Sequence, residues 1–236
     1  MSRNHSQRNR RGTAPRRSRR SNKQVPFGIP RNSRRNMSNQ PTTPFVPPED
    51  WYEPFDEPVE GFDVVHQDPG AGYIHVLTED EVRQRLEDLP EEWLEPLQVV
   101  QFSRLTRKKR QFPCYGMQWG PAIYLYPVEE TLVEYFGRPP RPAQLVEARM
   151  YGGKWEQLDD TCWTLTWTER QVRDFFLNNV LIHELGHLLD DRNRSYEARE
   201  RYAEWFSIEY GYRPTRDRWK RNGKPKSKSV TKRHHR

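Results

Sequence analysis

The chain has 236 residues, enough for one ordinary domain or slightly more, and only 33% of them are hydrophobic. Its net charge of +7 hides an uneven distribution, because residues 1–48 carry 12 Lys and Arg, residues 213–236 carry 11, and residues 49–212 have a net charge of −15. No apolar run approaches the roughly 20 residues of a membrane span, and two cysteines are too few for a disulfide framework, which excludes membrane-spanning and disulfide-rich secreted classes. No apolar stretch follows the basic N-terminus, so we expect an intracellular (cytoplasmic) protein without a signal peptide.

The basic ends of the chain have little that could form a core. Residues 1–48 are rich in Arg, Asn, Ser, Gln and Pro, and we expect a disordered arm. Clusters such as Arg16–Arg20 favour binding to nucleic acid or another polyanion, and a solubilising tail is the alternative. Residues 213–236 have the same two interpretations, which leaves 49–212 as the folded domain.

The first half of this domain mixes short strands and helices. Thr78 and Glu81 have the spacing of a capping box, which predicts a helix over about 79–89. Alternation and bounding prolines or glycines predict the other elements, namely strands at 72–77, 97–102 and 121–127 and helices at 128–136 and 142–150.

The second half contains the clearest patterns. Residues 162–168 alternate, with Trp163, Leu165 and Trp167 on one face, which predicts a half-buried strand. A second capping box follows and predicts a long helix over 169–191. A final helix is expected from 195 to 210, with Gly211 as its C-cap and Pro214 preventing continuation, and the fold class is therefore α+β.

The long helix carries the motif His183-Glu184-Leu185-Gly186-His187 inside an apolar run. Residues four apart on a helix lie on one face, so His183 and His187 could bind a single metal ion, with Glu184 beside them to accept a proton from water. Two core histidines are the alternative. The apolar surroundings favour the metal, because buried ionisable groups are costly without a partner.

A zinc site usually has three protein ligands, so two histidines are incomplete. No histidine lies between His187 and the C-terminal tail, which leaves the acids of the following helix. Glu197, Glu200 and Glu204 share one face of that helix, so the third ligand is expected to be an acid of this face. A solvated acidic face paired with neighbouring arginines is the alternative.

The H-E-L-G-H motif followed by E-x-x-A-E-x-F over residues 200–206 resembles the gluzincin zinc metallopeptidases, particularly the anthrax lethal factor type and small bacterial or phage relatives. The resemblance covers residues 161–211. It implies Zn²⁺ held by His183, His187 and Glu200, with Glu204 orienting a histidine. The short gap between His187 and Glu200 leaves Glu204 as an alternative ligand.

The resemblance also implies a small zincin-like domain, with a mixed or antiparallel sheet packed on the active-site helix and a glutamate helix after it. Such a protein would be an endopeptidase that uses a zinc-activated water, with Glu184 as general base. Its partner would be a protein or peptide substrate lying along an edge strand, for which 161–168 and 121–126 are candidates. Candidates to stabilise the oxyanion are Tyr196, Arg199, Tyr202 and Tyr210.

A second class of function is a nucleic-acid-binding or virion-associated protein whose zinc site is largely structural. The basic ends of the chain favour binding to a polyanion. The intact Glu184 favours catalysis, because a purely structural site has no need of that carboxylate.

Overall fold

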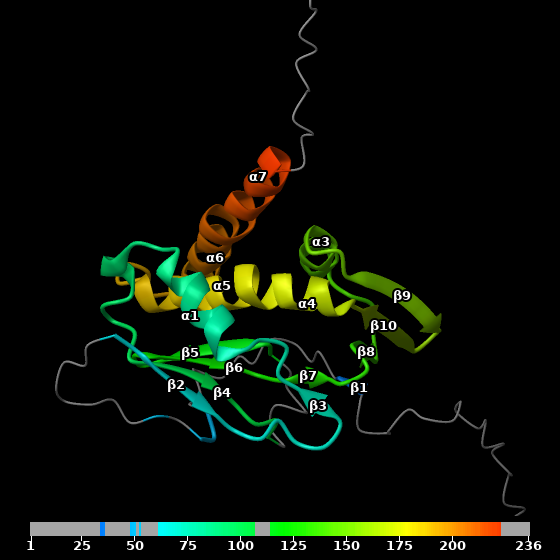
Figure 1. Ribbon diagram of the computed structural model, residues 1–236. Coiled ribbons are helices and arrows are strands. Elements are labelled where there is room, and N and C mark those ends of the chain that lie inside the picture. Colours follow the sequence, from blue (N-terminus) through cyan, green and yellow to red (C-terminus); the bar gives the residue numbers. More distant parts are fainter. Residues whose placement is uncertain (1–33, 36–47, 51, 53–60, 107–113, 223–236) are drawn as a thin grey trace, which may run out of the picture. The chain divides into compact units, whose positions relative to one another are not determined.

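The computed structural model describes residues 34–35, 48–50, 52, 61–106 and 114–222. Chain contacts divide the protein into residues 1–30 and 31–236, and every described residue belongs to the second unit. The described helices and strands are drawn in Figure 1, and none of these helices is long and apolar enough to span a bilayer. Helices and small sheets both occur, as the α+β class requires.

A mixed four-stranded sheet forms one layer of this unit. Strands β2 (Asp63–His66), β4 (Val99–Phe102) and β6 (Ala122–Leu125) are parallel, and β5 (Gly116–Trp119) pairs antiparallel with β6 at the edge. Every residue of β4 and β6 is buried, as expected for central strands covered on both faces. The predicted strands at 97–102 and 121–127 are confirmed, whereas β2 and β5 were not predicted.

The remaining strands form a second four-stranded sheet and a two-stranded one. The larger has the order β1 (Arg34–Arg35), β8 (Val133–Phe136), β10 (Cys162–Thr166), β9 (Lys154–Asp159). The smaller pairs β3 (Tyr73–Ile74) with β7 (Val128–Glu129). Strand β10 confirms the strand predicted at 162–168, although burial does not alternate along it and its β9 partner was not predicted.

The helix predicted over 128–136 is wrong, because this segment forms β7 and β8. Leu132 between them has a positive φ of 55°, which a helix does not allow. Val133, Tyr135 and Phe136 favour a strand that pairs with β10. The enclosed carboxylate of Glu134 receives a hydrogen bond from the Tyr115 hydroxyl at 2.7 Å, which fixes this strand against the start of β5.

The helices begin where their capping residues predict. Thr78 and Glu81 form the capping box of α1 (Glu79–Glu87), and Thr168 and Gln171 form that of α4. Between them lie the 3₁₀ turn η1 (Glu91–Trp93) and α3 (Pro142–Met150), and the latter confirms the helix expected at 142–150.

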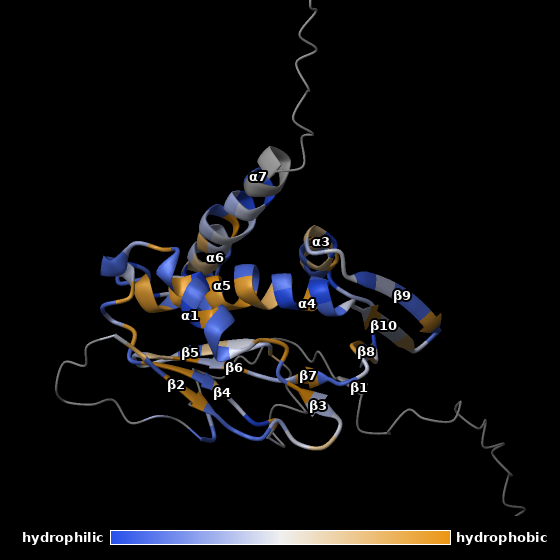
Figure 2. Cartoon of the chain, viewed as in Figure 1, coloured by the Kyte–Doolittle hydropathy of each residue, from blue (hydrophilic) through white to orange (hydrophobic). Residues whose placement is uncertain are grey.

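The long helix predicted over 169–191 exists as three consecutive segments. These are α4 (Glu169–Phe175), the π-helical η2 (Phe176–Val180) and α5 (Leu181–Leu189). Helix α5 contacts β5 and β6, and its residues are largely hydrophobic, as Figure 2 shows. This packing holds the His-Glu-x-x-His motif against the edge of the mixed sheet.

The C-terminal helix is longer than predicted. It runs through α6 (Tyr196–Phe206), the π-helical η3 (Ser207–Tyr212) and α7 (Arg213–Asn222). The predicted stop at Gly211 and Pro214 is wrong, because η3 runs directly into α7 and Pro214 is the second residue of α7, in a first turn where proline is tolerated.

Two parts of the basic ends therefore have regular structure, against the expectation of disorder. Helix α7 covers residues 213–222, and Arg34–Arg35 forms β1, parallel to β8. The other residues of both ends lie outside the described ranges, apart from 48.

Candidate metal centre

Three side chains on α5 and α6 converge as a potential metal site. The Nε2 atom of His187 lies 3.3 Å from one carboxylate oxygen of Glu200, and Nε2 of His183 lies 3.7 Å from the other. The two imidazole rings are nearly perpendicular, with centroids 4.8 Å apart. Each of the three residues offers one potential ligand atom, and these three atoms lie within 4.8 Å of one another. In a tetrahedral zinc site, ligand atoms are about 3.4 Å apart, so these donors fit one ion.

A glycine inside the motif allows α6 to approach α5. A β-carbon on Gly186 would lie 3.0 Å from Cβ of Phe206 and 3.1 Å from Cα of Ala203. Both separations are tighter than ordinary contacts, so a larger residue at 186 would push the two helices apart. Gly186 therefore helps to bring Glu200 within reach of the histidines.

The turn between α5 and α6 is fixed by a buried carboxylate. Asp190 is only 7% exposed, and its Oδ1 accepts hydrogen bonds from the backbone N–H groups of Arg192 and Asn193. The side-chain amide of Asn193 donates to the same carboxylate at 2.9 Å. Ser195 then caps α6 by accepting a hydrogen bond from the Ala198 N–H at 3.2 Å. These contacts set the direction in which α6 returns along α5.

The charges of the three residues depend strongly on one another. Burial works against ionisation of Glu200, yet hydrogen bonds and charge interactions with His183 and His187 lower the pKa of its carboxyl to about 2. Burial also opposes the cationic form of His183, but Glu200 and Glu184 raise the pKa of this imidazole. A divalent cation would take the place of these mutual interactions.

The structure brings Glu200, and not Glu204, to the histidines. Glu204 lies one turn further along α6, is exposed and is outside the three-residue cluster. The Nδ1 atom of His187 is buried and has no hydrogen-bond partner among the described residues. Glu204 therefore does not make the expected hydrogen bond to Nδ1 of His187.

Glu184 lies beside the cluster and is almost enclosed, with 8% of its surface exposed. Strand β5 covers it, since a β-carbon on Gly116 would lie 2.8 Å from both Cγ and Oε1 of the glutamate. Desolvation raises the pKa of this carboxyl, while the two histidines and a hydrogen bond from the backbone of Gln118 act in the opposite direction. A buried carboxyl with a raised pKa is suited to accept and return a proton near neutral pH.

The four candidates for an oxyanion stabiliser occupy different places. Tyr196 shares a hydrogen bond with Glu200 and is 46% exposed, so its hydroxyl reaches the cluster from the solvent side. Arg199 instead connects α6 to α5 and β5, because its Nη2 donates to the carbonyl of His187 at 3.1 Å and to Oε1 of Gln118 at 3.3 Å. Tyr196 is thus the best placed of the four.

The other two tyrosines pack against aromatic rings. Tyr202 lies against Trp205, and the guanidinium of Arg192 lies over its ring at 5.4 Å. Tyr210 packs on Trp93 and Phe206 with centroid distances of 4.6 and 4.7 Å. Their contacts are those of structural residues.

Both strands expected to form the substrate edge are interior strands. The 161–168 segment contributes β10, which lies between β8 and β9, and 121–126 contributes β6, which lies between β4 and β5. The strand that ends the mixed sheet beside α5 is β5. Met117 and Trp119 alternate with Gly116 and Gln118, but four residues are too few for this alternation to predict a strand.

Gly116, Gln118 and Glu147 are site-adjacent residues that sequence reasoning missed. Glu147, on α3, is close enough to His183 for their charges to interact. None of the three belongs to a recognisable motif, because each reaches the site only through tertiary packing. No protein-family model, no curated protein and no solved structure matches the chain.

Proposed function

We propose that this protein is a zinc-dependent endopeptidase of the gluzincin type. The observation that carries the proposal is the cluster of His183, His187 and Glu200, with the enclosed carboxylate of Glu184 next to it. Two imidazoles and one carboxylate leave a fourth position open for water or substrate, which is typical of catalytic zinc sites. The mixed sheet, the helix against its edge strand and the glutamate helix support a zincin-like domain.

The chain's own residues would divide the work of peptide hydrolysis. Bound zinc would supply a Lewis acid for the peptide carbonyl and lower the pKa of water towards about 7. Glu184 would accept the proton of the attacking water and return it to the leaving amine. The backbone of Gln118 and the close approach of Gly116 hold this carboxylate in one orientation. Tyr196 would donate a hydrogen bond to the developing oxyanion.

Strand β5 would lie beside the substrate. Among the described strands, β5 ends the mixed sheet next to α5, so a peptide that approaches the metal cluster from this side would run along it. Gln118 points its N–H towards Glu184, which indicates that this edge faces the catalytic carboxylate. A peptide bound there would pass the metal cluster.

Substitution of Glu184 tests the proposal. Glu184→Gln keeps the size of the side chain but removes the base, so zinc should stay bound while peptide cleavage falls by about 10²-fold or more. His187→Ala should instead lose zinc, which elemental analysis would measure. Cleavage that persists in a purified, zinc-loaded Glu184→Gln protein would refute this mechanism.

We also propose that the basic ends bind nucleic acid or another polyanion. The 12 basic residues in 1–48 and 11 in 213–236 flank an acidic body, which supports an electrostatic role for the ends. Binding to DNA should weaken steeply with salt and disappear when both ends are removed. DNA binding that remains in residues 49–212 would contradict this role.

A further inference from the structure

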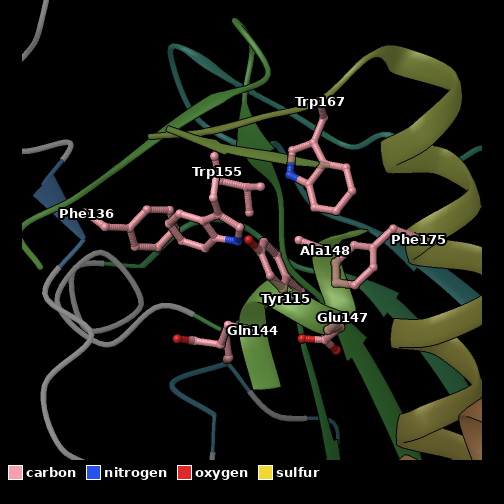
Figure 3. Close-up of a pocket in the computed structure, with 10 residues that line it drawn as sticks. Tyr115, Phe136, Gln144, Glu147, Ala148, Trp155, Trp167 and Phe175 are labelled. Atoms are coloured by element: carbon pink, nitrogen blue, oxygen red, sulfur yellow. The ribbon is translucent and has the colours of Figure 1, made fainter. Parts of the chain in front are cut away.

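A pocket lined by aromatic rings lies between α3, α4 and the second sheet. The pocket is partly open to solvent. Figure 3 shows the aromatic side chains that surround it, which are Tyr115, Phe136, Trp155, Trp167 and Phe175. Phe136 and Trp155 have ring centroids 4.6 Å apart, and Trp167 stacks on Phe175 at 5.0 Å. These contacts hold the walls of the pocket in place without an occupant.

The charged groups at this pocket are acidic. Glu147 lines one side of it, next to Gln144, as Figure 3 shows. A second carboxylate, that of Glu134, is completely buried just behind the wall, where it accepts hydrogen bonds from Tyr115 at 2.7 Å and Trp167 at 3.3 Å. The described lining residues include no lysine or arginine. The described residues at this pocket therefore supply acidic groups and no basic side chain.

The same pocket adjoins the candidate metal centre. Asn179 donates a hydrogen bond to Oε1 of Glu147 at 2.5 Å, and Asn179 lies just one turn before His183 on the long helix. The carboxylate of Glu147 is also close enough to interact with the charge of His183. A side chain next to a peptide bond at the metal centre would thus be near the entrance of the pocket.

We propose that this pocket selects a basic residue, arginine or lysine, adjacent to the bond that is cleaved. The inference rests on the proposed peptidase function and adds a substrate class to it. The alkyl stem would lie between the rings, and the cation would face both the aromatic π-surfaces and the carboxylate of Glu147. An apolar occupant would remove water from Glu147 and supply no opposite charge, which is unfavourable.

The preference is tested with matched peptides and the zinc-loaded full chain. The peptides differ only beside the cleaved bond, where they carry arginine, citrulline, lysine, norleucine or phenylalanine. We expect kcat/KM to be about tenfold higher for arginine than for its neutral isostere citrulline. Glu147→Gln should reduce the arginine-to-citrulline ratio of kcat/KM from about tenfold to about one, and this ratio, measured within the same variant, is the readout. Glu156→Gln, an exposed acid on β9, is the matched control and should keep the preference.

A binding measurement separates this inference from the proposed function. The indole N–H of Trp155 is buried without a hydrogen-bond partner among the described residues, so its NMR resonance should respond to an occupant. N-acetyl-arginine amide should shift the indole signals of Trp155 and Trp167, and the citrulline analogue should not. These shifts without any peptide cleavage would overturn the peptidase and retain the pocket. Equal cleavage of arginine and citrulline peptides, or equal shifts with both amides, would overturn the selection of a basic residue.

Discussion

Gly211 lies directly against the carbonyl oxygen of Asn178, and a β-carbon at position 211 would be only 1.9 Å from that oxygen. The contact joins the two π-helical segments η2 and η3, which precede α5 and follow α6 respectively. The carbonyl also accepts a hydrogen bond from the Tyr151 hydroxyl at 3.0 Å. The glycine is therefore needed for a backbone crossing, and its predicted role as a helix cap is wrong.

Gly211→Ala should destabilise the protein strongly. The neighbouring atom belongs to the backbone, so the two helices must separate, and we expect a loss of about 2–4 kcal/mol in the free energy of unfolding. Urea denaturation would measure it. Gly70→Ala is the control, because its β-carbon would meet no atom within 4 Å and only its φ of 95° opposes the change. Equal losses in the free energy of unfolding for the two variants would show that the contact between Gly211 and the Asn178 carbonyl does not require a glycine.

Gly116→Ala should impair catalysis while leaving zinc in place. Its β-carbon would lie 2.8 Å from Glu184 and from Cγ1 of Val180, so the carboxylate must rotate away from its position. A misplacement of about 1 Å can reduce turnover by about 10²-fold. Peptidase activity and zinc content should be measured on the same sample. A parallel loss of both would instead point to a general disruption of the site.

Zinc stoichiometry would distinguish the two glutamates of α6. Glu200→Ala removes the carboxylate whose Oε1 lies 3.3 Å from Nε2 of His187, and we expect zinc affinity to fall by more than about 10²-fold. Glu204→Ala should lower it by less than about tenfold, since this side chain is exposed and outside the cluster. The reverse order would make Glu204 the ligand.

The stability contributed by Glu81 should depend on pH. Partial burial opposes its ionisation, but hydrogen bonds from the Thr78 backbone and from Arg173 lower the pKa of this carboxyl below 4.5. Its ionised form therefore stabilises the folded state above that ordinary pKa, and the contribution is lost as pH falls through the lowered value.

Glu81→Gln should reduce the free energy of unfolding by up to about 1 kcal/mol at pH 7, because it removes the charge from an ion pair between α1 and α4, whereas an amide at this position can still accept the capping hydrogen bond. The difference from the unmodified protein should shrink as the pH is lowered below about 4.5. The control is Glu79→Gln, whose partner Arg83 is on the same helix and whose side chain is 40% exposed. We expect a smaller effect there at every pH.

Local signals were sufficient where the relevant contacts are close in sequence. Both capping boxes predicted the starts of their helices, and the spacing of the histidines predicted the face on which they meet. The acidic face of the next helix offered Glu197, Glu200 and Glu204 as the third ligand, and the gluzincin resemblance favoured Glu200 over Glu204. The turn at Asp190 sets how this face arrives at the histidines.

Tertiary contacts decided the rest. Residues 128–136 form strands because Tyr73, Ile74 and β10 pair with them, and nothing in the segment itself identifies those partners. Strand β5 has only four residues, and no local pattern shows which element it meets, so its position beside Glu184 could not be predicted. Glu147 was missed for a similar reason, since its helix meets the site through Asn179.

The π-helical segment η2 lies between the pocket wall on α4 and the histidines on α5. A π turn contains more residues than an α turn, and each added residue rotates the remainder of the helix by roughly 100°. Phe175 lines the pocket and His183 belongs to the metal cluster, and η2 therefore helps to set the angle between them around the helix axis. Substitutions along α4 can reshape the pocket wall without turning the histidines. Removing one residue from 176–180 would instead rotate the two ends against each other.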